Sequence, residues 1–207
     1  KRYLIFSGGE YSRVQELRPD DFVIACDRGL LNAGRAGVLP DLIVGDFDSY
    51  NGDLPPDVEV LRYPSEKDDT DTMIAVRYAV EHGAGEIVFC SALGGRLDHS
   101  FANIQSAVYA VSHGIKASII CDDTRIFFLR DGEQSFEPQD GWSLSVFSIS
   151  DKCENVSISG AKYELDNAVI TNGFPVGVSN DWKSSSVRVS VGCGILMIVE
   201  SRMETGD

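Results

Sequence analysis

The chain has 207 residues, 43% of them hydrophobic, and its 18 Lys and Arg against 32 Asp and Glu give a formal net charge of −14. It is long and apolar enough for one large domain or two small ones, which excludes intrinsic disorder. The negative charge argues against nucleic acid and anionic membranes as partners, because neutralising phosphates requires clustered Lys and Arg.

The first half of the sequence alternates short apolar runs with amphipathic segments. We predict strands at 3–7, 22–26, 42–44, 58–63, 86–91 and 117–121. Helices are predicted at 71–82 and from Ser100 onward, where apolar residues recur on one face. Strands alternating with helices indicate a three-layer α/β domain with a parallel sheet, which places ligands at the carboxyl ends of its strands.

From about Thr124 the sequence changes to short runs separated by turn residues. We predict strands at 125–129, 142–149, 155–159, 186–191 and 195–200, with no further amphipathic helix. This pattern favours an all-β domain, a sandwich or a barrel-like fold. We place the boundary near Asp122 to Arg125, giving an α/β domain at 1–123 and a β domain at 124–207.

The cysteines and the apolar runs indicate the cytoplasm. No CxxC pair occurs, and most of the five cysteines lie within apolar runs, as reduced core residues do. No apolar stretch approaches the roughly 20 residues that span a bilayer. We therefore expect a cytoplasmic protein without a membrane partner.

A pair of aspartates, Asp46 and Asp48, follows the apolar run that begins at Leu42. Alternation along an extended segment puts both carboxylates on one side. At ~4 Å two such charges repel by about 4 kcal/mol at an effective dielectric near 20, so they need a cation, a shared proton or open water. A hard divalent metal or a solvated acidic loop would each satisfy them.

A second polar cluster, KDDTDT, runs from Lys67 to Thr72. Thr70 is a plausible N-cap, which would put Asp71 in the first helical turn, where the helix dipole stabilises a carboxylate. Capping alone would explain Asp71. However, Lys67, Asp68 and Asp69 crowd the same junction beyond what a cap requires.

The third cluster, LGGRLDH, contains Gly94, Gly95 and Arg96. The glycines let the backbone approach a phosphate, and the arginine offers a planar fork to its oxygens. Asp98 either caps the next helix or belongs to the site, and His99 either contacts ligand or simply begins that helix.

Several other residues have structural interpretations. His82 and His113 precede glycines at helix ends and are predicted to cap them. Trp142 is predicted to lie in the core of a strand. Trp182 is either a stacking surface for a flat ring or a loop anchor.

In chain order, the motifs ACDRGL at 25–30, PDLIVGDFDS at 40–49, KDDTDT at 67–72 and GGRLDH at 94–99 resemble the thiamine pyrophosphokinase family. The resemblance covers the full length and implies an α/β nucleotide domain, a C-terminal β-sandwich and a homodimer. It further implies transfer of a pyrophosphoryl group from ATP to the hydroxyethyl oxygen of thiamine, giving thiamine diphosphate and AMP, with Mg²⁺ required.

The resemblance also assigns roles to the residues of the motifs. Asp46, Asp48 and Asp71 are similar to metal ligands, Asp98 completes the acidic cluster, and Arg96 and Lys67 would neutralise phosphate. We hypothesise that Asp98 or Asp71 accepts the hydroxyl proton. The implied nucleotide contacts are Ser7, Gly8, Gly9, Asp27, Gly29, Gly94, Gly95 and Arg96, although the residues after the first two strands are also typical of turns. No GxxxxGK[ST] motif occurs, so a phosphate cradle of the Walker type is excluded.

Thiamine in this family lies between subunits, against the sandwich domain of the partner subunit. Ser179 and Asn180 match the family's Ser-Asn turn, Trp182 stands where relatives often carry another aromatic residue, and Asp68 is the fourth implied thiamine contact. Arg28 departs from the glycine that many members have, which leaves its role open.

Two other functions fit part of the pattern. A haloacid-dehalogenase-like phosphatase would use Asp46 as a nucleophile, but its DxD usually follows the first strand, whereas here the motif follows the third. A non-catalytic sensor of thiamine or nucleotide would keep the pocket without turnover.

Overall fold

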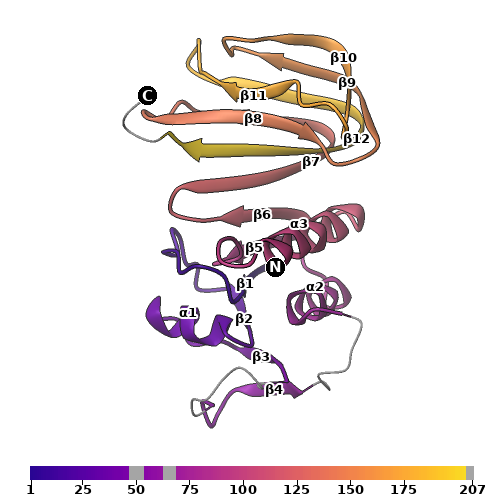
Figure 1. Ribbon diagram of the computed structural model, residues 1–207. Coiled ribbons are helices and arrows are strands. Elements are labelled where there is room, and N and C mark those ends of the chain that lie inside the picture. The colour runs from indigo at the N-terminus through magenta and orange to yellow at the C-terminus, as the bar shows by residue number, and fades with distance from the viewer. Residues whose placement is uncertain (47–53, 63–68, 204–207) are drawn as a thin grey trace. The chain divides into compact units, whose positions relative to one another are not determined.

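The protein is described by a computed structural model, which defines residues 1–46, 54–62 and 69–203. The chain divides into two compact units, Lys1–Asp122 and Asp123–Asp207 (Figure 1). Within the described part of the chain, no helix has the length and apolar character needed to cross a bilayer.

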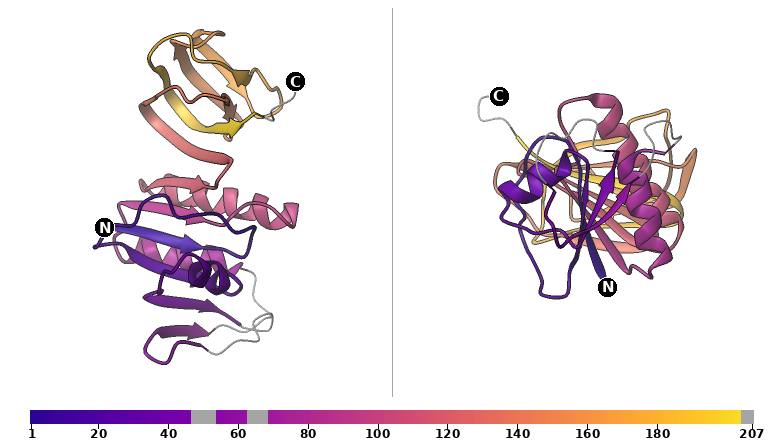
Figure 2. Two further views of the ribbon diagram at one scale, coloured as in Figure 1. Left: turned by 90° about the vertical axis from the view of Figure 1, so that its left-hand side faces the viewer. Right: turned by 90° about the horizontal axis from the view of Figure 1, so that it is seen from below.

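The first unit is an α/β fold with three layers. Its elements are β1 (Arg2–Phe6), β2 (Phe22–Cys26), α1 (Gly29–Arg35), β3 (Leu42–Gly45), β4 (Glu59–Arg62), α2 (Asp71–Glu81), β5 (Glu86–Cys90), α3 (Leu97–Ser112) and β6 (Lys116–Ile120). The strands pair in parallel in the order β6-β5-β1-β2-β3-β4. Helix α1 covers one face of this sheet, and α2 and α3 cover the other (Figure 2, right). Every residue of β1 and β3 is buried, as expected for parallel strands covered on both faces.

The strand order reverses beside β1. The chain adds β2, β3 and β4 on one side of β1 and then places β5 and β6 on the other side. The loops that follow β1 and β5 therefore leave neighbouring strands and diverge toward opposite faces of the sheet. Such a switch point opens a crevice at the carboxyl ends of the strands.

The predicted strands and helices of this unit are confirmed within a few residues, apart from Tyr63, which lies outside the described residues. Thr70 caps α2 as predicted, since its hydroxyl oxygen accepts a hydrogen bond from the Met73 amide at 3.1 Å. His82 and His113 cap α2 and α3, each with Nδ1 within 2.8 Å of the tyrosine carbonyl oxygen four residues earlier.

Helix α1 was not predicted. Its seven residues include Gly29, Asn32 and Gly34, all of which disfavour helix in isolation. Burial of Leu30 and Ala33 against the sheet stabilises it instead.

The second unit is a β-sandwich. Its strands are β7 (Thr124–Phe136), β8 (Trp142–Ser148), β9 (Lys152–Ser159), β10 (Leu165–Thr171), β11 (Gly177–Asn180) and β12 (Val187–Arg202). The first half of β12 pairs with β9 and its second half with β8, while β7 follows β12 along both halves. The core includes Leu144, Val156, Val189 and Leu196, all at most 1% exposed. Trp142 is 8% exposed, so the prediction that it is a buried strand residue is confirmed.

The two predicted strands 186–191 and 195–200 are one strand with a bulge. The pairing of β12 with β7 shifts between Val191 and Ile195, where Gly194 has φ +102°. The glycines at this bulge had indicated a turn, whereas here they bend a continuous strand. Strands β10 and β11 were not predicted either.

A buried ion pair anchors the long loop between β1 and β2. Arg2 donates from Nε and Nη2 to the two carboxylate oxygens of Asp21, at 2.8 and 2.7 Å, and the Asp21 side chain is 2% exposed. The hydrogen bond from Arg2 holds the pKa of Asp21 below its ordinary value. Asp21 therefore contributes stability at neutral pH that is lost as the pH falls through its lowered pKa.

Asp21→Asn should lower the free energy of unfolding at neutral pH by about 1.5 to 3 kcal/mol, because it removes the two charged hydrogen bonds to the buried Arg2 guanidinium and leaves it the longer contact with Glu16 at 3.4 Å. The deficit relative to the native chain should shrink below about pH 4, where the unfolded chain also takes up this proton. Urea denaturation across the pH range measures both effects. The exposed neighbour provides the control: Asp20→Asn should change stability little at any pH, and equal effects from the two variants would contradict the assignment.

Candidate functional site

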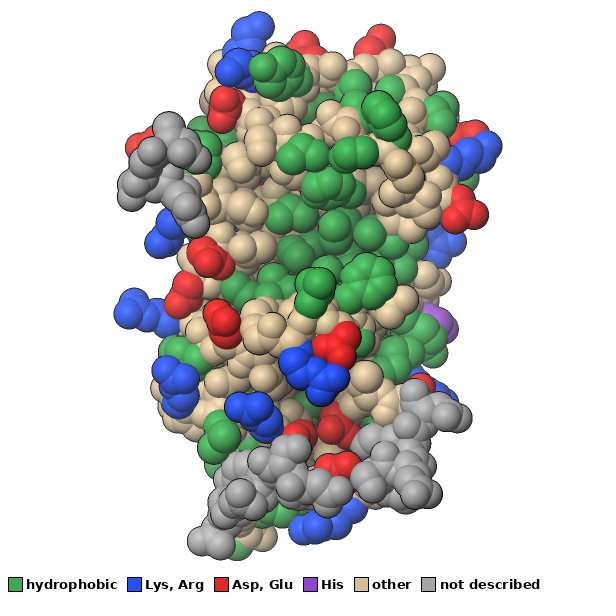
Figure 3. Space-filling model, in the orientation of Figure 1, with side chains coloured by type: hydrophobic (Ala, Val, Ile, Leu, Met, Phe, Trp, Pro, Cys, Tyr) green, Lys and Arg blue, Asp and Glu red, His purple; other side chains and the backbone are tan. Residues whose placement is uncertain are grey.

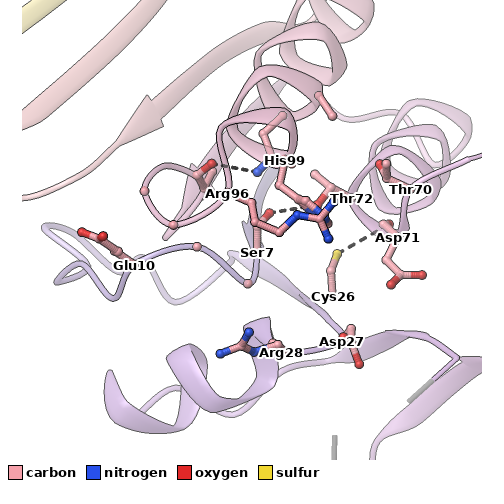
Figure 4. Close-up of a pocket in the computed structure, with 17 residues that line it drawn as sticks. Ser7, Glu10, Cys26, Asp27, Arg28, Thr70, Asp71, Thr72, Arg96 and His99 are labelled. Atoms are coloured by element: carbon pink, nitrogen blue, oxygen red, sulfur yellow. Dashed lines mark hydrogen bonds between the residues drawn. The ribbon is translucent and has the colours of Figure 1, made fainter. Parts of the chain in front are cut away.

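A pocket of about 570 Å³ opens at the switch point of the parallel sheet. This volume is in the range of small-ligand sites. The loops after β1, β2 and β5 and the first turns of α2 and α3 form it (Figure 4). Its lining residues are Ser7, Gly8, Gly9, Glu10, Cys26, Asp27, Arg28, Thr70, Asp71, Thr72, Ala92, Gly94, Gly95, Arg96, His99, Ala102 and Asn103.

The loops after β1 and β5 continue the pairing of their strands into the pocket. The amides of Ser7, Gly9 and Glu10 donate to the carbonyl oxygens of Cys90, Ser91 and Leu93 at 2.8 to 3.0 Å. A Cβ on Gly9 would lie only 2.4 Å from the Leu93 oxygen, so only glycine fits there. The loop after β1 is therefore fixed by its neighbour, with Gly8 exposed between the bonded residues.

Hydroxyl groups and a thiol fill the floor of the pocket. Ser7 Oγ lies 3.0 Å from Thr72 Oγ1, and both residues are buried. Cys26 Sγ donates to the Asp71 carbonyl oxygen at 3.6 Å (Figure 4). Thr72, Cys26, Glu10 and Asn103 were missed by the sequence analysis, because nothing in their spacing separates them from ordinary core and cap residues.

Carboxylates gather on one side of the pocket. Asp27 has φ +43°, which is uncommon outside glycine, and its Oδ1 is buried without a hydrogen-bond partner in the described part of the chain. Burial raises the pKa of Asp27, and repulsion from Asp71 and then Asp46 raises it further. In Figure 4, Asp27 and Asp71 lie on one side of the pocket, and Arg28 and Glu10 lie on the other.

Asp46 does not line the pocket, but it follows β3 beside Asp27. The Asp27 amide donates to the Val44 oxygen at 2.9 Å, and the Cα of Asp27 lies 3.4 Å from the place of a Cβ on Gly45. Within the described ranges, no three side chains of metal-ligand type are close enough to hold an ion. The predicted ligand Asp48 lies outside those ranges, as do Lys67 and Asp68.

The donors that are described still fit a hard divalent cation. All are carboxylate oxygens, they repel one another, and one buried oxygen has no hydrogen donor. This combination is costly without a compensating positive charge, and Mg²⁺ prefers oxygen ligands.

The two arginines of the pocket differ in their partners. Arg96 lies at the start of α3 and binds Asp98 through Nε and Nη2. This hydrogen bonding lowers the pKa of Asp98. Arg96 holds the N-cap position and Asp98 lies in the first helical turn, where its Oδ1 accepts a hydrogen bond from the His99 amide at 3.0 Å. Asp98 therefore stabilises the start of α3, although not from the N-cap position. Arg28 lines the pocket next to Asp27, where its amide and its charge lower the Asp27 pKa and partly offset the effect of burial.

Gly29 stands just outside the pocket and has a packing role. A Cβ at this position would lie 2.0 Å from the Phe6 carbonyl oxygen. Gly29 is not among the residues that line the pocket, and its contact with nucleotide stays a prediction. This glycine lets the first turn of α1 approach the end of β1.

Comparisons with known proteins were consistent with one another. The model described as "Thiamin pyrophosphokinase, catalytic domain" matches residues 14–119, and "Thiamin pyrophosphokinase, vitamin B1 binding domain" matches residues 134–196. The chain belongs to the thiamine pyrophosphokinase family. The enzyme of that name from Bacillus subtilis is 30% identical over 184 residues, covering 86% of each chain, and the one from rice is 25% identical over 79% of this chain and 67% of the relative.

Solved structures of the family share the fold. The crystal structure of the B. subtilis thiamine pyrophosphokinase superposes with a TM-score of 0.88 at 28% identity, covering 98% of this chain and 99% of that one. The structure from Geobacillus thermodenitrificans gives a TM-score of 0.81 at 29% identity, covering 99% of each.

The segment matched by the vitamin B1 binding model lies in the sandwich and contains three of the predicted thiamine contacts, Ser179, Asn180 and Trp182. Asn180 is 3% exposed, and its side chain accepts from the Tyr163 and Asp181 amides and donates to the Tyr163 oxygen. Ser179 has φ +54°, and its amide donates to Ser145 Oγ at 3.0 Å. Asn180 thus shapes the turn that presents Ser179.

Trp182 is a loop anchor. Its Nε1 donates to the Phe136 carbonyl oxygen at 3.0 Å, and its ring packs against the core of the sandwich. The anchor interpretation is confirmed, while contact with thiamine remains a prediction.

The close packing of α1 gives a paired test. Gly29→Ala should displace the loop after β1, lower thermal stability and weaken nucleotide binding by roughly tenfold or more, because its Cβ meets backbone rather than a movable side chain. Gly34→Ala lies in the same helix with nothing within 4 Å, so it should preserve binding and stabilise the helix by about 0.5 to 1 kcal/mol. Thermal melts and nucleotide titrations measure the two variants. Unchanged binding in Gly29→Ala would contradict the packing argument.

Proposed function

We propose that this chain transfers a pyrophosphoryl group from ATP to the hydroxyethyl oxygen of thiamine, giving thiamine diphosphate and AMP in a Mg²⁺-dependent reaction. The observation that carries the proposal is the match of both family models. The catalytic-domain match spans most of the residues that line the pocket, including its aspartates and arginines. The match favours this activity over the phosphatase alternative.

The backbone of two loops would bind the triphosphate. Gly8 and Gly95 line the pocket without side chains, and nothing lies within 4 Å of the place of a Cβ on Gly95, so phosphate oxygens can approach these amides. Gly94 would contact the nucleotide only if the Glu10 side chain, which packs against it, moves aside. Arg96 would contact phosphate after exchanging Asp98 for a phosphate oxygen, which suits its planar fork. Lys67, from the segment outside the described residues, would add a second positive charge.

Asp46, Asp48 and Asp71 would hold Mg²⁺, with Asp27 as a further candidate because of its unpartnered buried oxygen. When bound there, the ion supplies positive charge that neutralises phosphate oxygens during transfer. The residues of the chain orient the nucleotide, exclude water from the carboxylate side and set the line of approach for the thiamine hydroxyl.

The hydroxyl proton would pass to Asp71 or Asp98. In the present arrangement Arg96 lowers the pKa of Asp98 and so weakens it as a base. Release of Arg96 to phosphate would restore the proton affinity of Asp98, which couples nucleotide binding to base strength in this proposal.

Thiamine would bind through Ser179, Asn180, Trp182 and Asp68, at an interface with the sandwich of a partner subunit. The Trp182 ring is held by its hydrogen bond to the Phe136 oxygen, and the turn at Ser179 is held by the hydrogen bond from Asn180 to the Tyr163 oxygen. These hydrogen bonds support a thiamine site here, because they fix its residues in place before the ligand binds. The homodimer and the cytoplasmic location predicted from the sequence remain predictions.

Incubation with thiamine, ATP and Mg²⁺ should yield AMP and thiamine diphosphate in equal amounts, and EDTA should abolish both. Chromatography of the nucleotides and of the thiamine esters measures the outcome. Release of inorganic phosphate with an acid-stable phosphate on Asp46 would support the phosphatase instead. Saturable binding of thiamine and ATP without AMP would support the sensor.

Substituting Asp71 and Asp69 in turn distinguishes a specific catalytic role of one carboxylate from a general effect of negative charge near the pocket. Asp71→Asn should lower AMP formation by roughly a hundredfold or more, because it removes one of the carboxylates that would hold the Mg²⁺ ion against the reacting phosphates. Asp69→Asn should leave the rate within a factor of about two, because Asp69 forms an exposed ion pair with Arg77 at 2.8 Å and such pairs contribute little. Thr70 still caps the helix in both variants, so melting temperatures should stay close to that of the native chain. Equal losses of activity would contradict the assignment of Asp71.

A further inference from the structure

Asn32 is a buried polar residue that none of the site motifs contains. It lies in α1, is 7% exposed and does not line the pocket. Its Nδ2 donates to the carbonyl oxygens of Ser7 at 3.0 Å and of Gly9 at 3.1 Å. Because both neighbours are carbonyl acceptors, the amide group must present its NH₂ to them. One side chain thus holds two carbonyl groups of the loop after β1.

The position of Asn32 follows from the packing of Gly29. That glycine brings the first turn of α1 against Phe6, and residue 32 is three positions later, on the same side of the helix. The close approach therefore carries the amide of Asn32 to the loop that begins at Ser7. On the other flank, the loop after β5 holds the amides of Gly9 and Glu10.

The two hydrogen bonds fix the orientation of a peptide group in the pocket. In a trans peptide the carbonyl of one residue and the N–H of the next point in opposite directions. Binding of the Ser7 oxygen to Asn32 therefore turns the Gly8 N–H away from α1. Gly8 is exposed and lines the pocket, and its amide has no acceptor among the residues that the structure describes.

We propose that Asn32 is a positioning residue that holds the Ser7–Gly8 peptide with its N–H facing the phosphates of the nucleotide. This inference rests on the proposed function. Without Asn32 the peptide is free to rotate, and a carbonyl oxygen facing a phosphate repels it. Asn32 acts through Gly8 and touches neither substrate.

Selective labelling observes this peptide directly. Serine labelled with ¹³C at the carbonyl and glycine labelled with ¹⁵N give correlations only for Ser-Gly pairs, which in this sequence are Ser7-Gly8 and Ser159-Gly160. Gly160 is an internal control, because its amide donates to Glu164 in the sandwich at 2.8 Å. Addition of ATP and Mg²⁺ without thiamine should shift the Gly8 signal and leave the Gly160 signal in place.

Asn32→Ala should abolish most of the Gly8 shift at equal nucleotide occupancy. It should also raise KM for ATP by roughly tenfold to a hundredfold, as expected for loss of a hydrogen bond to a charged group, and change kcat and KM for thiamine far less. The control for lost stability is Ile119→Val or Ile119→Ala in β6, whichever matches the melting temperature of Asn32→Ala, and it should keep the native KM for ATP.

The outcomes separate the inference from the function. If the native chain makes AMP and thiamine diphosphate but Gly8 does not respond to ATP, the positioning role is wrong and the function stands. If Asn32→Ala keeps the Gly8 shift, or if the Ile119 control shows the same rise in KM, the role is also wrong. If the native chain binds ATP with the Gly8 shift but forms no AMP, the proposed function fails while the role in phosphate binding stands.

Discussion

The reversal of strand order beside β1 is the constraint on which the site depends. Because β2 and β5 both pair with β1, the loops after β1 and β5 begin side by side and then separate. Backbone hydrogen bonds hold the first residues of these loops together, and the pocket opens where they part. The carboxylates and the arginines reach this point from different elements, so their convergence is a property of topology rather than of any one motif.

Glycines and one asparagine convert that topology into a defined geometry. Gly9 and Gly29 stand where a Cβ would lie 2.4 and 2.0 Å from a carbonyl oxygen. Their absent side chains permit contacts between backbones that fix the loop after β1. Acidic and basic side chains are interspersed on the surface of the α/β unit in Figure 3, so the net charge of −14 does not prevent local positive charge.

Much of the fold was predictable because its signals are local. The strands at 22–26 and 42–44 are apolar runs bounded by polar residues, and the helix at 71–82 has both a cap and an apolar face. Helix α1 was not predictable, because tertiary burial overrides the propensities of its glycines and Asn32. The glycines around the bulge at Gly194 give the same sequence pattern as a turn, and only the pairing of β12 with β7 distinguishes the two.

The candidate site was predictable to the extent that its residues cluster in sequence. Asp27, Asp71 and Arg96 each belong to a short polar motif that the sequence shows, and the pocket brings the three motifs together. The contacts of Asn32 with Ser7 and Gly9 join residues more than 20 positions apart through a helix that the pattern concealed, so no local signal reports them.

The pairing of Arg96 with Asp98 has a consequence for anion binding. Both side chains are more than 60% exposed, and an exposed pair of this kind is worth only about 0 to 1 kcal/mol. The carboxylate therefore keeps the guanidinium extended at the start of α3 at little energetic cost. Breaking so weak a pair also costs little, so the arginine is easily freed for an incoming anion.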